Sequence, residues 1–290
     1  MKHFEDFWES TKAAVEHTLQ AALTLPDHEL TQAMRYCALG GGKRLRALLI
    51  YATADAVADS QNAHVAASAA AVELIHAYSL VHDDLPAMDD DALRRGKPTC
   101  HIAFGEAMAI LTGDALQTLA FQLLAETPEP ERAIAAVGVL ARRSGAAGMV
   151  LGQACDINAE GQALSLQALQ NIHRHKTGDL ILASVELGLI AGNPTLEQKQ
   201  ALLQYGENVG LLFQIQDDIL DVESDAATLG KATQKDATLE KATYPALMGL
   251  SEAKKKRDAL LEDSLNLLAS VQLQSGYLAD IARMAANRKH

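Results

Sequence analysis

The sequence predicts an all-α protein folded as one domain over residues 1–290. Hydrophobic residues form 49% of the chain and aromatic residues only 4%. Ala and Leu dominate, and this composition favours packed helices over sheets. Helical periodicity is nearly continuous, the loops are short, and we find no internal repeat or low-complexity linker. The length is ample for one large core, although it is also long enough for two domains to be considered.

Helices of the first half are expected between glycine- and proline-containing breaks. Residues 4–23 carry apolar side chains at helical spacing, and Pro26 closes this segment. A second helix starts near Glu29 and ends at Gly40-Gly41-Gly42. Lys43, Arg44 and Arg46 then begin a third helix, which continues as LRALLIYATADAV. The next expected segments are apolar helices over 63–81, 106–125 and 132–142.

Helices of the second half follow the same rules. An apolar helix is expected over 179–190, and Gly192-Asn193-Pro194 forms a turn after it. A helix from Leu196 carries Gly206 and Gly210, and glycines inside a helix mark close packing or space. Residues 223–243 are polar and are expected to be a mobile loop, and 251–270 form a charged amphipathic helix.

The charge balance excludes several classes of function. The net charge of −12 argues against nucleic-acid binding, which needs a basic face. An anionic substrate must therefore be met by local cations or by metal. Cys37, Cys100 and Cys155 are an odd number without metal-ligand spacing, and indicate reduced thiols in a cytosolic protein. We expect no signal peptide and no membrane-spanning segment.

The stretch Leu74–Pro98 concentrates charge at the end of an apolar helix. It holds five aspartates, which are Asp83, Asp84, Asp89, Asp90 and Asp91, followed by Arg94, Arg95 and Lys97. Carboxylates are disfavoured at a helix C-terminus, so something positive should compensate them. Mg²⁺ bridges carboxylates to phosphates, and arginines suit diphosphate oxygens. The alternative is a solvated acidic turn, as most charge runs are.

A second acidic cluster weakens that alternative. Gln214, Asp217, Asp218 and Asp221 share one helix face at about 100° per residue. Like charges one turn apart repel unless a cation lies between them. An exposed polar stripe is the alternative here too, but the surrounding residues 209–220 are largely apolar, and buried carboxylates need partners.

The glycine-rich segment before the third helix is a candidate anion site. Lys43, Arg44 and Arg46 stand at a helix start, where cations oppose the dipole unless an anion is bound. The segment departs from the nucleotide-binding P-loop pattern, and no β-strand is expected before it. An ordinary capped loop remains the alternative.

Two aspartate-rich helix segments resemble those of the trans-isoprenyl diphosphate synthases of the bacterial farnesyl diphosphate synthase type. The motifs are Asp83-Asp84-Leu-Pro-Ala-Met-Asp89 and Asp217-Asp218-Ile-Leu-Asp221, and the likeness runs from Gly40 through Pro245. This resemblance implies a single-domain helical bundle of the isoprenoid synthase type around a central cavity. It also implies a cytoplasmic homodimer without stable membrane insertion.

The resemblance assigns roles residue by residue. Mg²⁺, as three ions with substrate bound, would be held by Asp83, Asp84, Asp89, Asp217, Asp218 and Asp221. Isopentenyl diphosphate would be seated by Lys43, Arg46, His76 and Arg95. The allylic diphosphate would be met by Arg94, Lys176, Thr177, Lys231 and Lys241, and Gln214 is implied in substrate binding. The residues implied in catalysis are Asp83, Asp84, Arg94, Lys176 and Lys231. Leu151, Gln234 and Glu240 depart from the family pattern, because glycine is common at each of these positions.

The implied reaction is head-to-tail condensation of isopentenyl diphosphate with dimethylallyl and then geranyl diphosphate. An allylic diphosphate ionises, the double bond of isopentenyl diphosphate attacks the carbocation, and a proton is lost. Product length would be limited by Tyr78 and Ser79, the fifth and fourth residues before the first aspartate, which predicts farnesyl diphosphate. Tyr78 packing merely in the core is the alternative.

Three other functions share part of this pattern. A geranylgeranyl or longer-chain synthase would share every charged motif and differ in the pocket floor. A terpene cyclase would lack the GGGKRLR segment and the second aspartate cluster. A non-catalytic partner subunit should have lost aspartates, and this chain keeps both sets.

Overall fold

The computed structural model describes residues 2–57, 63–229 and 242–288, and these residues are almost entirely helical. The α-helices are α1 (Lys2–Ala22), α2 (Glu29–Ala38), α3 (Leu45–Val57), α4 (Ala63–Asp83), α5 (Cys100–Phe104), α6 (Glu106–Ala125), α7 (Pro130–Ser144), α8 (Met149–Ala159), α9 (Leu166–His173), α10 (Asp179–Ile190), α11 (Leu196–Leu229), α12 (Tyr244–Met248), α13 (Leu250–Ala269) and α14 (Tyr277–Asn287). A π-helix, η1 (Arg174–Gly178), joins α9 to α10. The predicted all-α class is confirmed.

A short hairpin is the departure from that class that the sequence analysis missed. β1 (Leu93–Arg94) pairs antiparallel with β2 (Lys97–Pro98). The two turn residues, Arg95 and Gly96, have φ angles of 53° and 74°. Positive φ at both central residues is the signature of a tight two-residue hairpin turn. The hairpin follows directly on the first aspartate motif, so it places Arg94 beside the end of α4.

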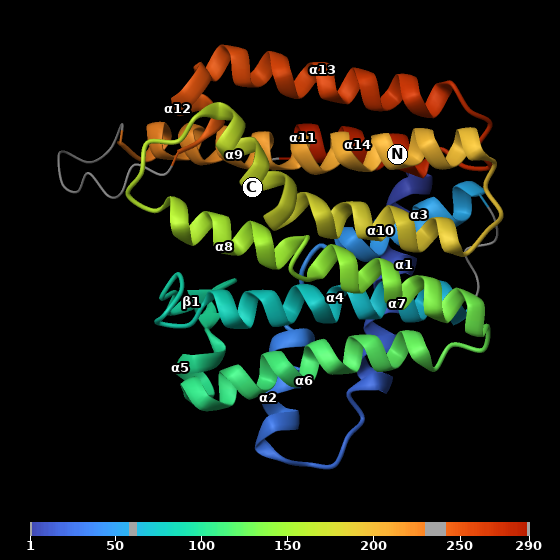
Figure 1. Ribbon diagram of the computed structural model, residues 1–290, viewed down its shortest axis with the longest axis vertical. Helices are drawn as coiled ribbons and strands as arrows, with labels where there is room; N and C mark the ends of the chain where they lie inside the picture. The colour runs from blue at the N-terminus through green and yellow to red at the C-terminus, as the bar shows by residue number, and fades with distance from the viewer. Residues whose placement is uncertain (1, 58–62, 230–241, 289–290) are drawn as a thin grey trace. The chain divides into compact units, whose positions relative to one another are not determined.

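The packing of the helices divides the chain into two compact units. Unit 1 comprises Met1–Ala141 and Glu186–Asn193, and α4 forms its centre. α4 packs along α6 and α3, and Figure 1 shows α4 and α6 side by side. Most of α4 is buried, and the helix is apolar on nearly every side. A helix that is apolar all round is stable only inside a core.

Unit 2 comprises Arg142–Val185 and Pro194–His290, and α11 is its longest helix. α11 packs along α13, as Figure 1 shows, and against α14. Gly206 and Gly210 lie where α11 approaches other residues closely: a Cβ at Gly210 would be 3.1 Å from the Cα of Gly178. The expectation that these glycines mark close packing is confirmed.

Two element boundaries differ from the predictions. The helix expected over 63–81 continues through Asp83, so the first aspartate belongs to its last turn. The loop expected over 223–243 is wrong at its start, because α11 continues to Leu229. Residues 223–229 contain neither glycine nor proline, so nothing there interrupts the hydrogen-bond ladder. Residues 230–241 lie outside the described part of the chain.

Within the described part of the chain, three segments are long and apolar enough to cross a membrane by length and composition alone. They are Ala63–Asp83, Glu106–Ala125 and Pro130–Ala159, of whose apolar windows 72%, 39% and 33% are buried in the protein. The first is therefore accounted for by the core of unit 1. The single domain around a central cavity stays a prediction.

Candidate active site

The first aspartate motif closes on itself at the end of α4. Asp83 and Asp84 are 8% and 3% exposed. The backbone N–H of Asp89 donates to the carbonyl oxygen of Asp83 over 2.8 Å, so the intervening loop returns Asp89 to the helix end. The longer spacing of this motif therefore still brings its first and last aspartates together. Asp89 is exposed.

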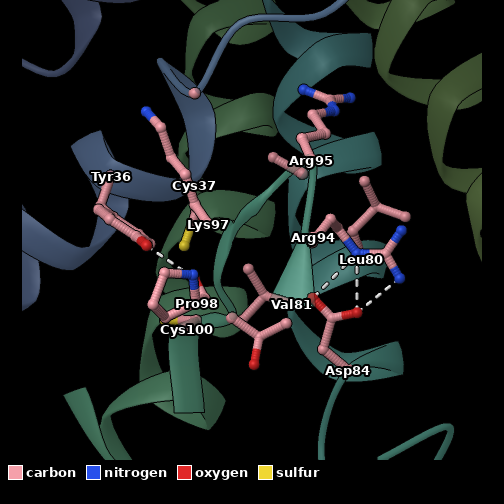
Figure 2. Close-up of a pocket in the computed structure, with 13 residues that line it drawn as sticks. Tyr36, Cys37, Leu80, Val81, Asp84, Arg94, Arg95, Lys97, Pro98 and Cys100 are labelled. Atoms are coloured by element: carbon pink, nitrogen blue, oxygen red, sulfur yellow. Dashed lines mark hydrogen bonds and ion pairs between the residues drawn. The ribbon is translucent and has the colours of Figure 1, made fainter. Parts of the chain in front are cut away.

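Arg94 is the cation that compensates the buried Asp84. Its Nε donates to both carboxylate oxygens of Asp84, over 2.7 and 3.0 Å, and its NH2 group is 3.5 Å from Asp91. Figure 2 shows the two side chains facing each other across one wall of a pocket. This pocket, of about 70 Å³, is also lined by Arg95 and Lys97. Four charged groups therefore converge on one concave surface.

The basic loop divides its cations between structure and solvent. Arg44 is buried and has a φ of 50°, and its guanidinium binds Glu16, Glu73 and the carbonyl of Ala38. Lys43 beside it is exposed. The structure thus separates a structural arginine from the two cations, Lys43 and Arg46, that the sequence assigned to substrate.

Arg46 carries an unused donor. Its Nε is buried and has no hydrogen-bond partner among the described residues. Burial lowers the pKa of Arg46, with Glu73 opposing the shift and Arg95 adding to it. The guanidinium of Arg95 donates to the carbonyl of Gly41, which links the hairpin to the glycine loop. A buried donor without a partner is costly, so this site is suited to an anion.

His76 lies next to these cations as a neutral imidazole. Burial, followed by the positive charges of Arg46, Arg95, Arg94 and Arg44, holds the pKa of His76 well below its usual value. A neutral ring can donate one hydrogen bond to a phosphate oxygen and accept another. The predicted role of His76 in substrate binding stays a prediction.

Tyr78 and Ser79 lie on α4, on the N-terminal side of the aspartates. Tyr78 is 6% exposed, and its ring meets the ring of His82 edge-on at 5.7 Å between centroids. The Ser79 hydroxyl donates to the carbonyl of His76 over 2.9 Å. A Cβ at Gly113 of α6 would lie 2.1 Å from Nε2 of His82, so this glycine leaves the room that His82 occupies. Tyr78 and His82 therefore form a pair of packed rings on α4, before Asp83 in the sequence.

In unit 2, Lys176 and Thr177 stand on the π-helix η1. The Lys176 ammonium binds Asp156 of α8 over 2.6 Å. A Cβ at Gly152 would lie 2.0 Å from the Lys176 backbone nitrogen, so only glycine lets α8 approach this closely. Single-turn π-helices occur frequently at functional sites. The sequence analysis found the pair but not the π-helix that displays it.

A buried carboxylate holds the end of η1. Asp179 is 4% exposed, and it accepts from Arg143 and from Nδ1 of His175, each over 2.7 Å. These contacts fix the turn that carries Lys176. These three residues were not predicted from the sequence. Asp179 contacts Arg143 and His175, which lie 36 and 4 positions away, and no motif links the three.

The second aspartate motif lies on α11. Asp218 is 8% exposed, burial raises its pKa to about 6, and it accepts from the backbone N–H of Tyr244 over 2.8 Å. Asp217 pairs with Arg288, whose guanidinium also lies 3.9 Å over the ring of Phe213. Asp221 is exposed, and Gln214 is half-buried on the same helix. The predicted shared face holds carboxylates in three different environments.

The donor set of both motifs fits a hard divalent cation. All of these ligands are carboxylate oxygens, and Asp84 and Asp217 each already bind a cationic side chain. Among the described residues, no three His, Cys, Asp or Glu side chains are gathered closely enough to hold a metal ion by themselves. A metal site at either motif would be completed by substrate oxygens, as is usual for Mg²⁺. Lys231 and Lys241 lie outside the described residues.

Comparison with known proteins identifies the family. Residues 27–272 match the polyprenyl synthetase family. The chain belongs to the polyprenyl synthetase family. It is similar to the farnesyl diphosphate synthases of Escherichia coli (strain K12), at 51% identity over 96% of this chain and 97% of that protein, and of Haemophilus influenzae (strain ATCC 51907 / DSM 11121 / KW20 / Rd), at 45% identity over the full length of both.

A solved structure supports the same assignment. The polyprenyl synthetase chain described here resembles an FPP/GFPP synthase from Zymomonas mobilis with a TM-score of 0.87 and 37% identity, over 98% of this chain and 99% of that one. The predicted family resemblance and the predicted prenyltransferase class are therefore confirmed. The roles of individual residues stay predictions.

Proposed function

We propose that this polyprenyl synthetase makes (2E,6E)-farnesyl diphosphate. Isopentenyl diphosphate would condense with dimethylallyl diphosphate and then with geranyl diphosphate, releasing diphosphate at each step. The observation that carries the proposal is the buried Asp83–Asp84 pair at the end of α4. Arg94 is bound to Asp84, and Tyr78 lies on the same helix, on the N-terminal side of Asp83. Near full-length similarity to two farnesyl diphosphate synthases supports it.

The charged residues would act on the allylic diphosphate. Asp83, Asp84 and Asp89, together with Asp217, Asp218 and Asp221, are proposed to hold three Mg²⁺ ions, which would neutralise the leaving diphosphate. Arg94 and Lys176, with Thr177, Gln214, Lys231 and Lys241, would bind its oxygens. Cations aimed at the charge that develops on the leaving group lower the barrier to ionisation.

The basic loop would seat the second substrate. Lys43, Arg46 and Arg95 would bind the diphosphate of isopentenyl diphosphate, and the neutral His76 would donate one hydrogen bond to it. Its double bond attacks C1 of the allylic cation, and the resulting cation loses a proton to the departed diphosphate. Exclusion of water protects the cation during this step. The unpartnered Nε of Arg46 supports this assignment.

A cytoplasmic homodimer is proposed for the assembly, without nucleic acid or stable membrane insertion. Apolar side chains of unit 1 support a protein contact there: Ile102, Ile110 and Leu111 are 55%, 47% and 52% exposed. A contiguous patch of such exposed apolar side chains would mark an interaction site. Sedimentation analysis measures the oligomeric state directly.

One incubation tests the proposed reaction. The purified chain receives isopentenyl and dimethylallyl diphosphates with Mg²⁺, and the dephosphorylated products are sized by chromatography, with a chelator-treated sample as the control. Farnesol as the main product supports the proposal. Twenty-carbon alcohols would indicate the longer-chain alternative, cyclic hydrocarbons a terpene cyclase, and absence of condensation a partner subunit, each of which overturns it.

A further inference from the structure

Two cysteines of unit 1 meet beside the candidate active site. Cys37 lies in the last turn of α2 and is half-buried, whereas Cys100 begins α5 and is 3% exposed. Both line the pocket that also contains Asp84, and Figure 2 shows both side chains there. The third cysteine, Cys155, is on α8 in unit 2.

Neighbouring contacts hold the two cysteines together. The Tyr36 hydroxyl donates to the carbonyl of Pro98 over 2.6 Å, and the Tyr36 ring meets that of Phe104 at 5.4 Å between centroids. The last turn of α2 is thereby fixed over the start of α5. In this arrangement the thiols of Cys37 and Cys100 hydrogen-bond to each other.

The contact makes one thiol the more acidic. The hydrogen bond from Cys37 lowers the pKa of Cys100, while that bond and burial raise the pKa of Cys37. A thiolate stabilised by a neighbouring thiol is the form that attacks a peroxide, and a second cysteine in reach resolves the product. The pair therefore has the arrangement of an oxidisable dithiol.

We propose that Cys37 and Cys100 form a dithiol site that a hydroperoxide converts to an intramolecular disulfide, and that this crosslink weakens isopentenyl diphosphate binding. The effect on the substrate rests on the proposed function, whereas the crosslink itself does not.

The oxidation balances with hydrogen peroxide as the oxidant. The Cys100 sulfur attacks one peroxide oxygen, the O–O bond breaks, and hydroxide leaves, which gives a sulfenic acid at Cys100. The Cys37 sulfur then attacks the Cys100 sulfur, the S–O bond breaks, and a disulfide forms. The two thiol protons combine with the two OH groups of the peroxide and leave as two water molecules. The small oxidant suits the limited access to Cys100.

The crosslink would act on the glycine loop and on the β1–β2 hairpin, the two segments next to the residues proposed to bind isopentenyl diphosphate. Cys37 precedes the glycine loop by three residues, and Cys100 follows Pro98 of the hairpin by two. A disulfide holds its sulfurs at about 2.0 Å, which is much closer than two hydrogen-bonded thiols. Closing this gap would displace the glycine loop, which leads into Arg46 at the start of α3, and the hairpin that carries Arg95; small displacements of binding groups are costly.

The experiment measures crosslink and binding separately. The reduced protein and its Cys37→Ser, Cys37→Ala and Cys155→Ser variants are treated with hydrogen peroxide, then digested without reductant for mass spectrometry. Isothermal titration with isopentenyl diphosphate is run on reduced, oxidised and re-reduced samples. Cys155→Ser is the matched control because it removes a thiol outside the pair.

The expected result is a peptide linking Cys37 to Cys100 in the wild type and in Cys155→Ser, and in neither Cys37 variant. Binding should weaken by roughly tenfold on oxidation and recover on reduction. No linked peptide, or unchanged binding in the fully crosslinked protein, would overturn the proposal. A reduced protein that fails to condense the substrates would instead overturn the proposed function, since the linked peptide is detected without any activity.

Discussion

Arg44 and Glu73 form a buried ion pair that joins the basic loop to α4. The guanidinium donates to one oxygen of Glu73 over 3.2 Å, and the other oxygen accepts from the backbone N–H of Ala47 over 3.2 Å. Glu73 therefore holds the loop and the first turn of α3 at the same time. Because this pair engages Arg44, the other two cations of the segment, Lys43 and Arg46, are the candidates for binding substrate.

Glu73→Ala should destabilise the fold by about 1–3 kcal/mol, because the buried Arg44 guanidinium loses one of its two carboxylate partners and the Ala47 N–H loses its acceptor. Denaturant unfolding measures the loss. Glu252→Ala is the control: its pair with Lys255 is exposed on both sides, and its removal should cost under about 1 kcal/mol. Equal losses in the two variants would contradict the structural role of Glu73.

Asp83→Ala and Asp217→Ala should each lower kcat by several orders of magnitude while circular dichroism stays unchanged. The proposed carboxylate–metal contacts are needed mainly in the transition state, so their loss appears in kcat. Asp258→Ala, which removes a 62% exposed aspartate on α13, is the control. Near-normal turnover in either motif variant would refute the proposed metal sites.

Arg46→Ala should chiefly weaken isopentenyl diphosphate, and Lys176→Ala chiefly the allylic substrate. Each variant removes a charge-assisted contact to a different diphosphate, and such contacts contribute about 1.5–3 kcal/mol. Isothermal titration of both substrates on both variants gives the comparison. The assignment fails if the two variants lose affinity for the same substrate to the same extent.

Tyr78→Ala should shift the products to twenty carbons or more. Its ring is buried on α4, on the N-terminal side of the aspartates. In the proposed function this ring limits the growing chain, so removing it opens a path for the chain along α4. Chromatography of the dephosphorylated products reports the change. His82→Ala is an informative companion, since its ring meets that of Tyr78. A soluble, active Tyr78→Ala protein that still stops at fifteen carbons would place the floor elsewhere.

Acid should destabilise the fold through His173. Burial lowers its pKa from 6.5 to about 4, and its Nδ1 is buried without a hydrogen-bond partner among the described residues. Between these pH values the unfolded chain binds the proton and the folded chain does not, so stability falls as the pH falls. The loss should reach roughly 2 kcal/mol over this range.

Denaturant unfolding from pH 6.5 to pH 4 on the wild type and His173→Gln measures that loss. The variant has no imidazole to titrate at this position, so its free energy of unfolding should fall less steeply on acidification. Parallel curves for the two proteins would show that His173 does not couple to folding.

The helices and both aspartate motifs could be predicted from the sequence because their signals are local. Long runs of apolar, helix-forming residues marked α4 and α6, and the spacing of Asp83, Asp84 and Asp89 marked the first motif. The start of the loop expected over 223–243 was wrong because polar composition alone does not end a helix, and residues 223–229 contain neither glycine nor proline. The hairpin at Arg95 and Gly96 was missed because two paired residues a strand are too few to form a periodic pattern.

The sequence by itself therefore determined the fold class through its composition, the family through the resemblance of its two aspartate motifs, and the residues that bear charge. Only the tertiary structure decided how those charges are used. Arg44 meets Glu73 across 29 positions, and Lys176 meets Asp156 across 20. Cys37 and Cys100 likewise come together where α2 packs against α5 and Tyr36 binds Pro98 across 62 positions. Contacts between distant residues depend on how helices pack, and no local pattern encodes that.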